Sequence, residues 1–169
     1  MDSKGIFADF FIALIFNFVS NIVVNKFNNI IVLSVLCLLF VLVGILFDII
    51  GTAVLSAKEA VFHAKSSKKI RGSKEGVYLI KNSSTIASIC NDVIGDICGI
   101  VSGSIAAMLG IIIANKFNIS LVFVTLLVSS FISSITVGGK AIGKRYAIKN
   151  ADKIIFVVAK VLNRFKFKK

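Results

Sequence analysis

Four long apolar stretches constrain the fold of this 169-residue chain more than any other feature. They run over Ile6–Val24, Ile30–Leu55, Ile86–Ala114 and Ile119–Val137. Each is long enough to cross a bilayer, because a transmembrane α-helix needs about 20 apolar residues. The links 25–29 and 115–118 leave room for little more than a turn, which predicts two antiparallel helical hairpins. The sequence therefore predicts an all-α fold, an integral membrane bundle of four transmembrane helices.

The distribution of positive charge predicts the orientation of these helices. With four spans, the N-terminus, the loop 56–85 and the tail 138–169 share one side, which carries 18 of the 20 Lys and Arg residues. The positive-inside rule places that side in the cytoplasm. We therefore expect a multi-pass protein of the cell inner (cytoplasmic) membrane with both termini in the cytoplasm. A three-span arrangement, in which Ile6–Val24 does not cross, keeps the same sides for loop and tail.

These features predict three regions. They are an N-terminal anchor span (1–29), a three-span membrane core with its cytoplasmic loop (30–137), and a basic amphipathic juxtamembrane tail (138–169). The apolar run of Ile6–Val24 exceeds the roughly 7–15 residues of a signal peptide, and no small-x-small cleavage site follows it, so we expect a retained anchor. In the loop, Gly72 and Gly76 are expected to break the helix.

The tail combines ten positive charges with the apolar run Ile154–Val158. This pattern is typical of a helix lying on an anionic inner leaflet with its apolar side toward the acyl chains. The bilayer is therefore the expected partner. Because membrane topology already accounts for the basic charge, we expect no nucleic-acid partner.

Polar residues recur at helical spacing inside three of the apolar stretches, where ionisable side chains mark functional sites. The faces are Gly44, Asp48, Thr52 and Ser56 in the second stretch, Ser88, Asp92 and Asp96 beside Asn91 in the third, and Thr125, Ser129 and Ser133 in the fourth. All three faces fall in the cytoplasmic half of the predicted bundle, which predicts one oxygen-lined pocket. Such a pocket suits Mg²⁺, which prefers oxygen ligands.

Two less specific interpretations stay open. Gly95, Gly99 and Gly103 form a small-xxx-small ladder, which more often serves helix packing, within the chain or in a homodimer, than a site. The hydroxyls of the fourth stretch either face the pocket or bond back to the i−4 carbonyls of their own helix.

Enzymatic chemistry finds no support in the sequence, so we expect no enzyme. His63, the single histidine, follows Glu59 by one helical turn, which predicts a solvated pair. Cys37, Cys90 and Cys98 all fall in apolar stretches. Cys90 and Cys98 would lie about 12 Å apart on one helix, too far for a disulfide.

Three patches in order resemble the transmembrane domain of the CorC/CorB and cyclin M magnesium transporter family. Ser56–Phe62 is similar to the S-x-x-E-x-A-L segment of that family, Cys90–Val93 to its G-N-N-L segment, and Gly139–Ala147 to its G-E-x-x-P-K-x-x-A segment. The resemblance covers about Ile30–Leu162. We expect no counterpart of the family's cytoplasmic regulatory domains in the residues after Val137.

The resemblance implies Mg²⁺ transport with ligands at Ser56, Asn91 and Asp92, and the polar pattern adds Asp48. Two positions depart from the family, since Lys140 stands where the glutamate ligand is expected and Gly143 where the proline is expected. A lysine ammonium about 4 Å from a monovalent cation would repel it by about 4 kcal/mol at an effective dielectric of 20, and a divalent ion by more. Lys140 is therefore expected to gate or block the site.

Three functions follow from these patterns. The first is divalent cation transport or sensing, with Mg²⁺ as the ion and a homodimer as the assembly. The alternative is a non-transporting membrane scaffold or regulator that keeps a relic cation pocket. The third is a small holin-like protein that permeabilises membranes.

Overall fold

The computed structural model describes residues 10–11, 14–15, 18 and 29–166. Within these residues the chain is helical and contains no strand, in agreement with the predicted all-α class. Three helical segments are long and apolar enough to cross a membrane, namely Ile30–Ser56, Ser83–Phe117 and Leu121–Lys149. Most of the predicted anchor Ile6–Val24 lies outside the described residues, so a fourth span stays a prediction.

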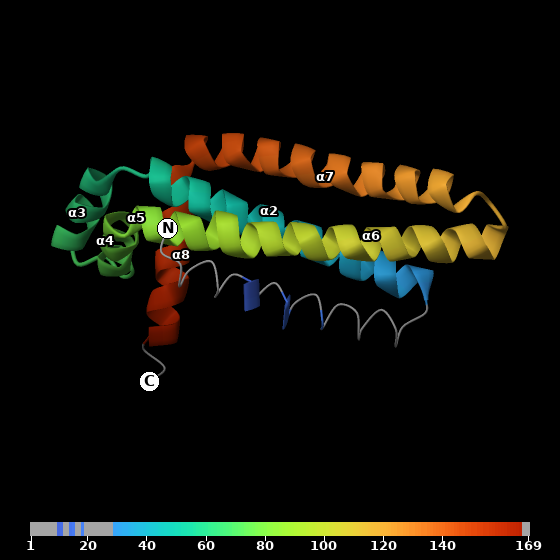
Figure 1. Cartoon of the computed structure of the whole chain (residues 1–169). Coiled ribbons are helices and arrows are strands. Elements are labelled where there is room, and N and C mark those ends of the chain that lie inside the picture. Colours follow the sequence, from blue (N-terminus) through green and yellow to red (C-terminus); the bar gives the residue numbers. More distant parts are fainter. Residues whose placement is uncertain (1–9, 12–13, 16–17, 19–28, 167–169) are drawn as a thin grey trace. The chain divides into compact units, whose positions relative to one another are not determined.

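The helices follow one another closely along the chain (Figure 1). They are α2 (Ile30–Ser56), α3 (Glu59–Ser67), α4 (Ser73–Lys81), α5 (Ser83–Ser88), the π-helix η1 (Ile89–Gly95), α6 (Asp96–Phe117), α7 (Leu121–Lys149) and α8 (Ala151–Lys166). Segments α5, η1 and α6 run on without a break, which makes the third predicted stretch a single 35-residue helical segment, Ser83–Phe117.

The fourth predicted stretch ends later than expected. Helix α7 continues past Val137 through Gly138 and Gly139 to Lys149. The chain has no proline to stop it, and a glycine inside a helix costs only about 1 kcal/mol relative to alanine. The predicted tail therefore begins inside α7 and comprises the last part of that helix together with the separate helix α8.

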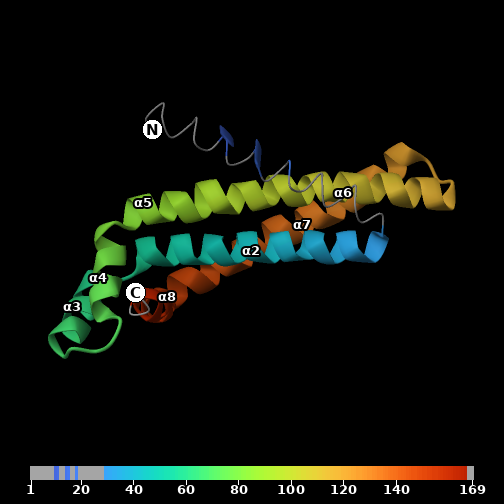
Figure 2. The ribbon, with the colours of Figure 1, turned by 90° about the horizontal axis from the view of Figure 1, so that it is seen from below.

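The chain divides into two compact units, residues 1–44 with 95–139 and residues 45–94 with 140–169. In the first unit α2 and α6 lie side by side (Figure 2), and Leu33, Val101 and Ile105 are fully buried. Around this narrow core the apolar side chains point outward. Half of the residues are buried in the apolar 18-residue stretch of Ser83–Phe117. In the corresponding stretch of Leu121–Lys149 only 6% are buried. A surface this apolar is typical of a helix that contacts lipid.

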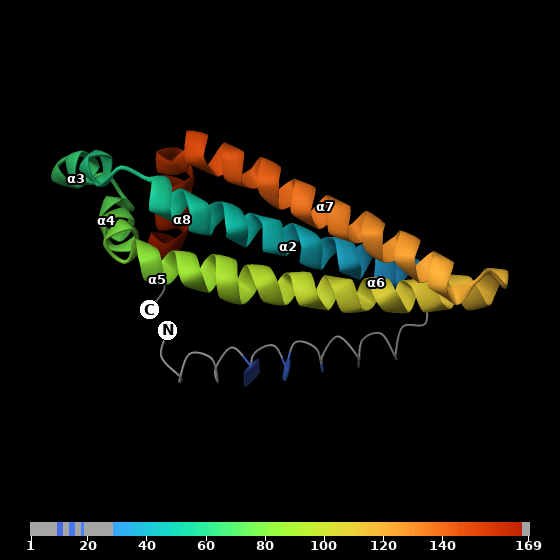
Figure 3. The same cartoon turned by 45° about the horizontal axis from the view of Figure 1, so that its top comes forward.

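The second unit has a more conventional core. Helix α4 packs against both α3 and α8 (Figure 3). Phe62 of α3 is fully buried, and its ring occupies the space where a Cβ at Gly76 would lie. Gly76 therefore allows the Phe62 ring of α3 to pack directly against α4. Helix α4 continues through this residue, so the prediction of a helix break at Gly76 was wrong. Gly72 directly precedes α4 with a left-handed φ of 89°, so the break expected there is confirmed.

Helix α8 buries one of its faces in this core. Ala151, Ile155, Ala159 and Asn163 recur at i+4 and are all buried. Val157, Val161 and Leu162 remain exposed. Part of the apolar face that the sequence assigned to the inner leaflet is thus covered by protein. Contact of the exposed residues with a bilayer stays a prediction.

Candidate functional site

Asp48 is the most deeply buried carboxylate among the described residues, with 3% of the residue exposed. Its Oδ2 lies 3.4 Å from the Nζ of Lys144 on α7, and both residues belong to the second unit. The same oxygen makes no hydrogen bond, so the lysine neutralises the carboxylate without being aligned as a donor. Burying a carboxylate is costly unless a charge compensates it. Lys144 is therefore the counter-charge of Asp48.

A glycine explains how Lys144 comes so close to α2. A Cβ at Gly143 would lie 2.8 Å from Cγ1 of Ile49 and 3.1 Å from its Cδ1. A side chain there would require the Ile49 side chain to move. Gly143, the position at which the resembled family has proline, thus lets the end of α7 approach α2 and places the next residue beside Asp48.

Asn91 faces the same helix from η1. Its carboxamide occupies the space where a Cβ at Gly51 would lie. Its Oδ1 is buried and accepts no hydrogen bond from the described residues. Gly51 follows Asp48 by three residues on α2, so the Asn91 side chain contacts α2 within one turn of Asp48. A buried acceptor without a donor is destabilising, by about 1–3 kcal/mol, and such an oxygen is a natural ligand for a cation.

Asn91 and Asp92 lie in the π-helix η1, which the sequence pattern did not reveal. Short π-helical turns inside α-helices are frequently found at functional sites. The two side chains differ in surroundings. Asp92 is exposed, and its Oδ2 accepts a hydrogen bond of 2.6 Å from Ser88 Oγ.

Ser56 and Lys140 complete the predicted set. Ser56 is exposed at the end of α2, and its hydroxyl donates to the carbonyl of Thr52 at 3.0 Å. Lys140 is half-buried on α7, one turn before Lys144. Lys144, which the sequence analysis did not single out, makes the ion pair with Asp48. Its spacing of four residues from Lys140 was the signal that could have identified it.

The ladder of Gly95, Gly99 and Gly103 packs against α2 at Gly95 and, among the described residues, has no close neighbour at the other two glycines. A Cβ at Gly44 would lie 3.4 Å from the carbonyl oxygen of Gly95 and 3.1 Å from Cβ of Cys98, so α2 and α6 approach closely at this point. At Gly99 and Gly103 a Cβ would meet nothing within 4 Å. These two glycines leave an open strip on α6.

The remaining polar residues have local partners. Thr125 donates to the carbonyl of Leu121 at 2.7 Å, which is the i−4 pattern weighed for this stretch, and Ser133 is exposed. His63 and Glu59 lie 3.0 Å apart with 53% and 49% of their side chains exposed, which confirms a solvated pair. The three cysteines are buried and form no disulfide with one another.

The donor set of this candidate site is small. Among the described residues, no group of three or more His, Cys, Asp or Glu side chains could hold a metal ion. What remains of the predicted set in buried positions is one carboxylate, that of Asp48 on α2, and one amide oxygen, that of Asn91 on η1.

Comparison of the chain with known protein families, with characterised proteins and with solved structures finds no match.

Proposed function

We propose that this protein is an integral membrane protein that binds a divalent cation such as Mg²⁺ at Asp48 and Asn91. The observation that carries the proposal is the buried Asp48 carboxylate, together with the buried Asn91 oxygen of η1, which accepts no hydrogen bond from the described residues and lies against Gly51, three residues after Asp48. Ser56 and Asp92 are the ligands that the family resemblance adds. Both are exposed here and would join the site only after the chain rearranges.

Lys144 acts in this proposal as a tethered competitor of the cation. Two unit charges 4 Å apart interact by about 4 kcal/mol at an effective dielectric of 20, and a divalent ion doubles the repulsion. The ammonium and Mg²⁺ therefore cannot both sit beside Asp48. Half of the Lys144 side chain is exposed, so the ammonium can move into water when the ion arrives. Ion binding would then be coupled to the position of α7, as transport or sensing requires.

The proposed setting is the cell inner membrane with the basic segments in the cytoplasm. Three long apolar helices support membrane insertion, and the positive-inside rule supports the orientation. The open strip at Gly99 and Gly103 supports a homodimer, since small residues let transmembrane helices approach closely.

Thermal unfolding in detergent with and without millimolar Mg²⁺ tests the cation site. We expect Mg²⁺ to raise the Tm of the native protein, and Asp48→Asn and Asn91→Ala each to remove the increase. Asn150→Ala is the matched control, because in the contacts described the side-chain amide of Asn150, between α7 and α8, donates only to the carbonyl of Tyr146, four residues earlier. Absence of a Tm increase in the native protein would rule out the site.

The second candidate is a non-transporting scaffold or regulator, and the Asp48–Lys144 ion pair favours it because the carboxylate is already neutralised. This function predicts that Lys144→Met or Lys140→Glu creates Mg²⁺ binding that the native protein lacks. Flux of radiolabelled Mg²⁺ into liposomes separates the two functions. A transporter carries the ion in its native form, whereas the scaffold carries none.

A further inference from the structure

A hollow on the second unit is lined by three cationic side chains, Arg71, Lys160 and Arg164. Arg71 lies in the turn between α3 and α4, whereas Lys160 and Arg164 are one turn apart on α8. Among the residues that the structure describes, no acidic side chain lines this hollow. We propose that it binds a phosphate group.

The backbone of the turn is built to hold Arg71 in place. Gly72 has a φ of 89°, and a Cβ at this position would lie 3.2 Å from the Cα and the backbone nitrogen of Lys160. The turn therefore packs directly on the backbone of α8. As a result Arg71 is held next to two cations that lie about ninety residues further along the chain.

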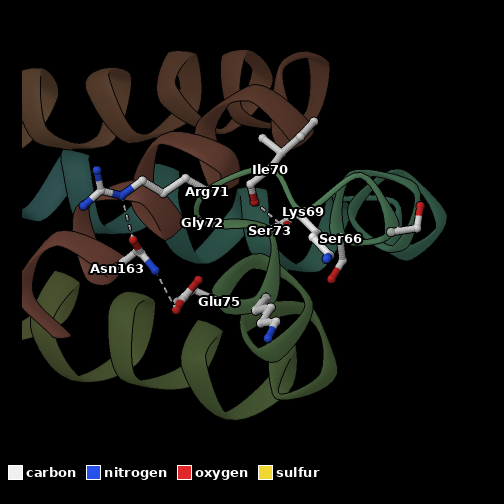
Figure 4. Close-up of a pocket in the computed structure, with 10 residues that line it drawn as sticks. Ser66, Lys69, Ile70, Arg71, Gly72, Ser73, Glu75 and Asn163 are labelled. Carbon is white, nitrogen blue, oxygen red and sulfur yellow. Dashed lines mark hydrogen bonds between the residues drawn. The ribbon is translucent and has the colours of Figure 1, made fainter. Parts of the chain in front are cut away.

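A buried amide orients the guanidinium. Arg71 Nε donates to Oδ1 of Asn163 at 3.2 Å, and Asn163 Nδ2 donates to Oε1 of Glu75 at 2.9 Å (Figure 4). Only 6% of Asn163 is exposed. A planar guanidinium has five N–H donors in a fixed geometry, so a bond at Nε sets the direction of the others. This preorganisation lowers the entropy lost when an anion binds.

The surrounding charges raise the positive potential at the hollow. Residues 65–74 contain five Lys and Arg side chains and no acid. The ammonium of Lys160 lies 4.5 Å from the centroid of the Phe156 ring, and that of Lys65 lies 4.2 Å from the same centroid. The neighbouring acids, Glu75 and Asp152, accept hydrogen bonds from Asn163 and from the backbone N–H of Lys58.

The chemistry of the lining favours phosphate over a carboxylate. A phosphate presents several oxygens in different directions, which suits cations that arrive from two elements, and arginine binds such groups through paired N–H donors. The phosphate can belong to a lipid headgroup or be free in solution, and both present the same oxygens. None of these residues belongs to the proposed cation site, so the two proposals succeed or fail separately.

The experiment uses the full chain in detergent and two probes. Calorimetric titration with inorganic phosphate measures free anion, and native mass spectrometry counts retained phosphatidylglycerol against phosphatidylcholine. The variant is Lys160→Gln with Arg164→Gln. The matched control is Lys149→Gln with Lys153→Gln, which removes the same charge from exposed positions. We expect the variant to weaken binding about tenfold or more and the control to change it less than twofold.

The outcomes identify the source of the phosphate or overturn the site. Loss of inorganic phosphate binding in the variant identifies free phosphate, and loss of retained phosphatidylglycerol alone identifies a lipid headgroup. Arg71→Lys keeps the charge but removes the Nε bond to Asn163, so it should also weaken phosphate binding. If the double variant fails to fold, the binding of Arg71→Lys tests the proposal in its place. An equal loss in the control, or binding of neither probe to the native protein, overturns the proposal.

Discussion

The two units of this protein satisfy their polar groups in different ways. In the first unit the hydroxyls of Thr125, Thr136 and Ser102 donate to carbonyls three or four residues earlier on their own helices. The second unit has such local bonds too, as between Ser56 and Thr52, but its polar side chains also contact elements far apart in sequence: Lys144 forms an ion pair with Asp48, and Arg71 donates to Asn163. Local bonding suits helices surrounded by lipid, because each helix then needs no polar partner. Polar contacts between helices are where binding chemistry can be built.

The largest expected effect is on the free energy of unfolding, and it comes from truncating a buried side chain in the core of the second unit. Phe62→Ala removes a fully buried ring, so the free energy of unfolding should fall by about 3–5 kcal/mol. The same substitution at Phe131 of the first unit, which is 68% exposed, should change it by less than about 0.5 kcal/mol in detergent. Chemical denaturation of both variants measures the difference. Equal losses would show that the two units are not distinct in packing.

The second prediction concerns the ion pair. Lys144→Met leaves the Asp48 carboxylate buried without a counter-charge and should lower the free energy of unfolding by about 1–3 kcal/mol, since half of the lysine was already in water. Adding Asp48→Asn should restore most of the loss. Lys149→Met, on the exposed end of α7, is the control and should have little effect. A double variant no more stable than Lys144→Met would mean that the pair does not couple.

The smallest expected effect comes from two glycines in different surroundings. Gly76→Ala overlaps the ring of Phe62 and should lower the free energy of unfolding by about 1–3 kcal/mol. Gly99→Ala places its methyl group in open space and should raise that free energy by up to about 1 kcal/mol through helix propensity. Thermal unfolding at a fixed detergent concentration compares them. Destabilisation by Gly99→Ala would indicate that the strip is covered by a second copy.

The features that the sequence predicted are those set by the order of residues within one helix. Apolar length located the three helices that are candidate spans, and spacing drew attention to Asp48 on α2 and to Asn91, whose side chain the structure places against Gly51 of α2. It also predicted the exposed pair of Glu59 and His63. Each of these patterns is set by residues only a few positions apart, so periodicity is enough to detect them.

What the sequence did not predict depends on how closely helices approach. The role expected of Lys140 stays a prediction, but the ion pair of Lys144 with Asp48 was not foreseen; it forms where Gly143 lies against Ile49. The π-helix around Asn91 and the contact of Gly76 with Phe62 likewise depend on packing between elements. Helical periodicity gives the face of a residue but not the separation of two helices, so these features were not predictable.

Gly72 has a consequence for how this protein can vary. One hydrogen atom in place of a side chain permits both the left-handed turn and the contact with the α8 backbone. A side chain there would strain the left-handed turn and require the α8 backbone at Lys160 to give by a few tenths of an ångström. The same substitution would therefore lower stability and disturb the placement of Arg71 in the proposed phosphate site.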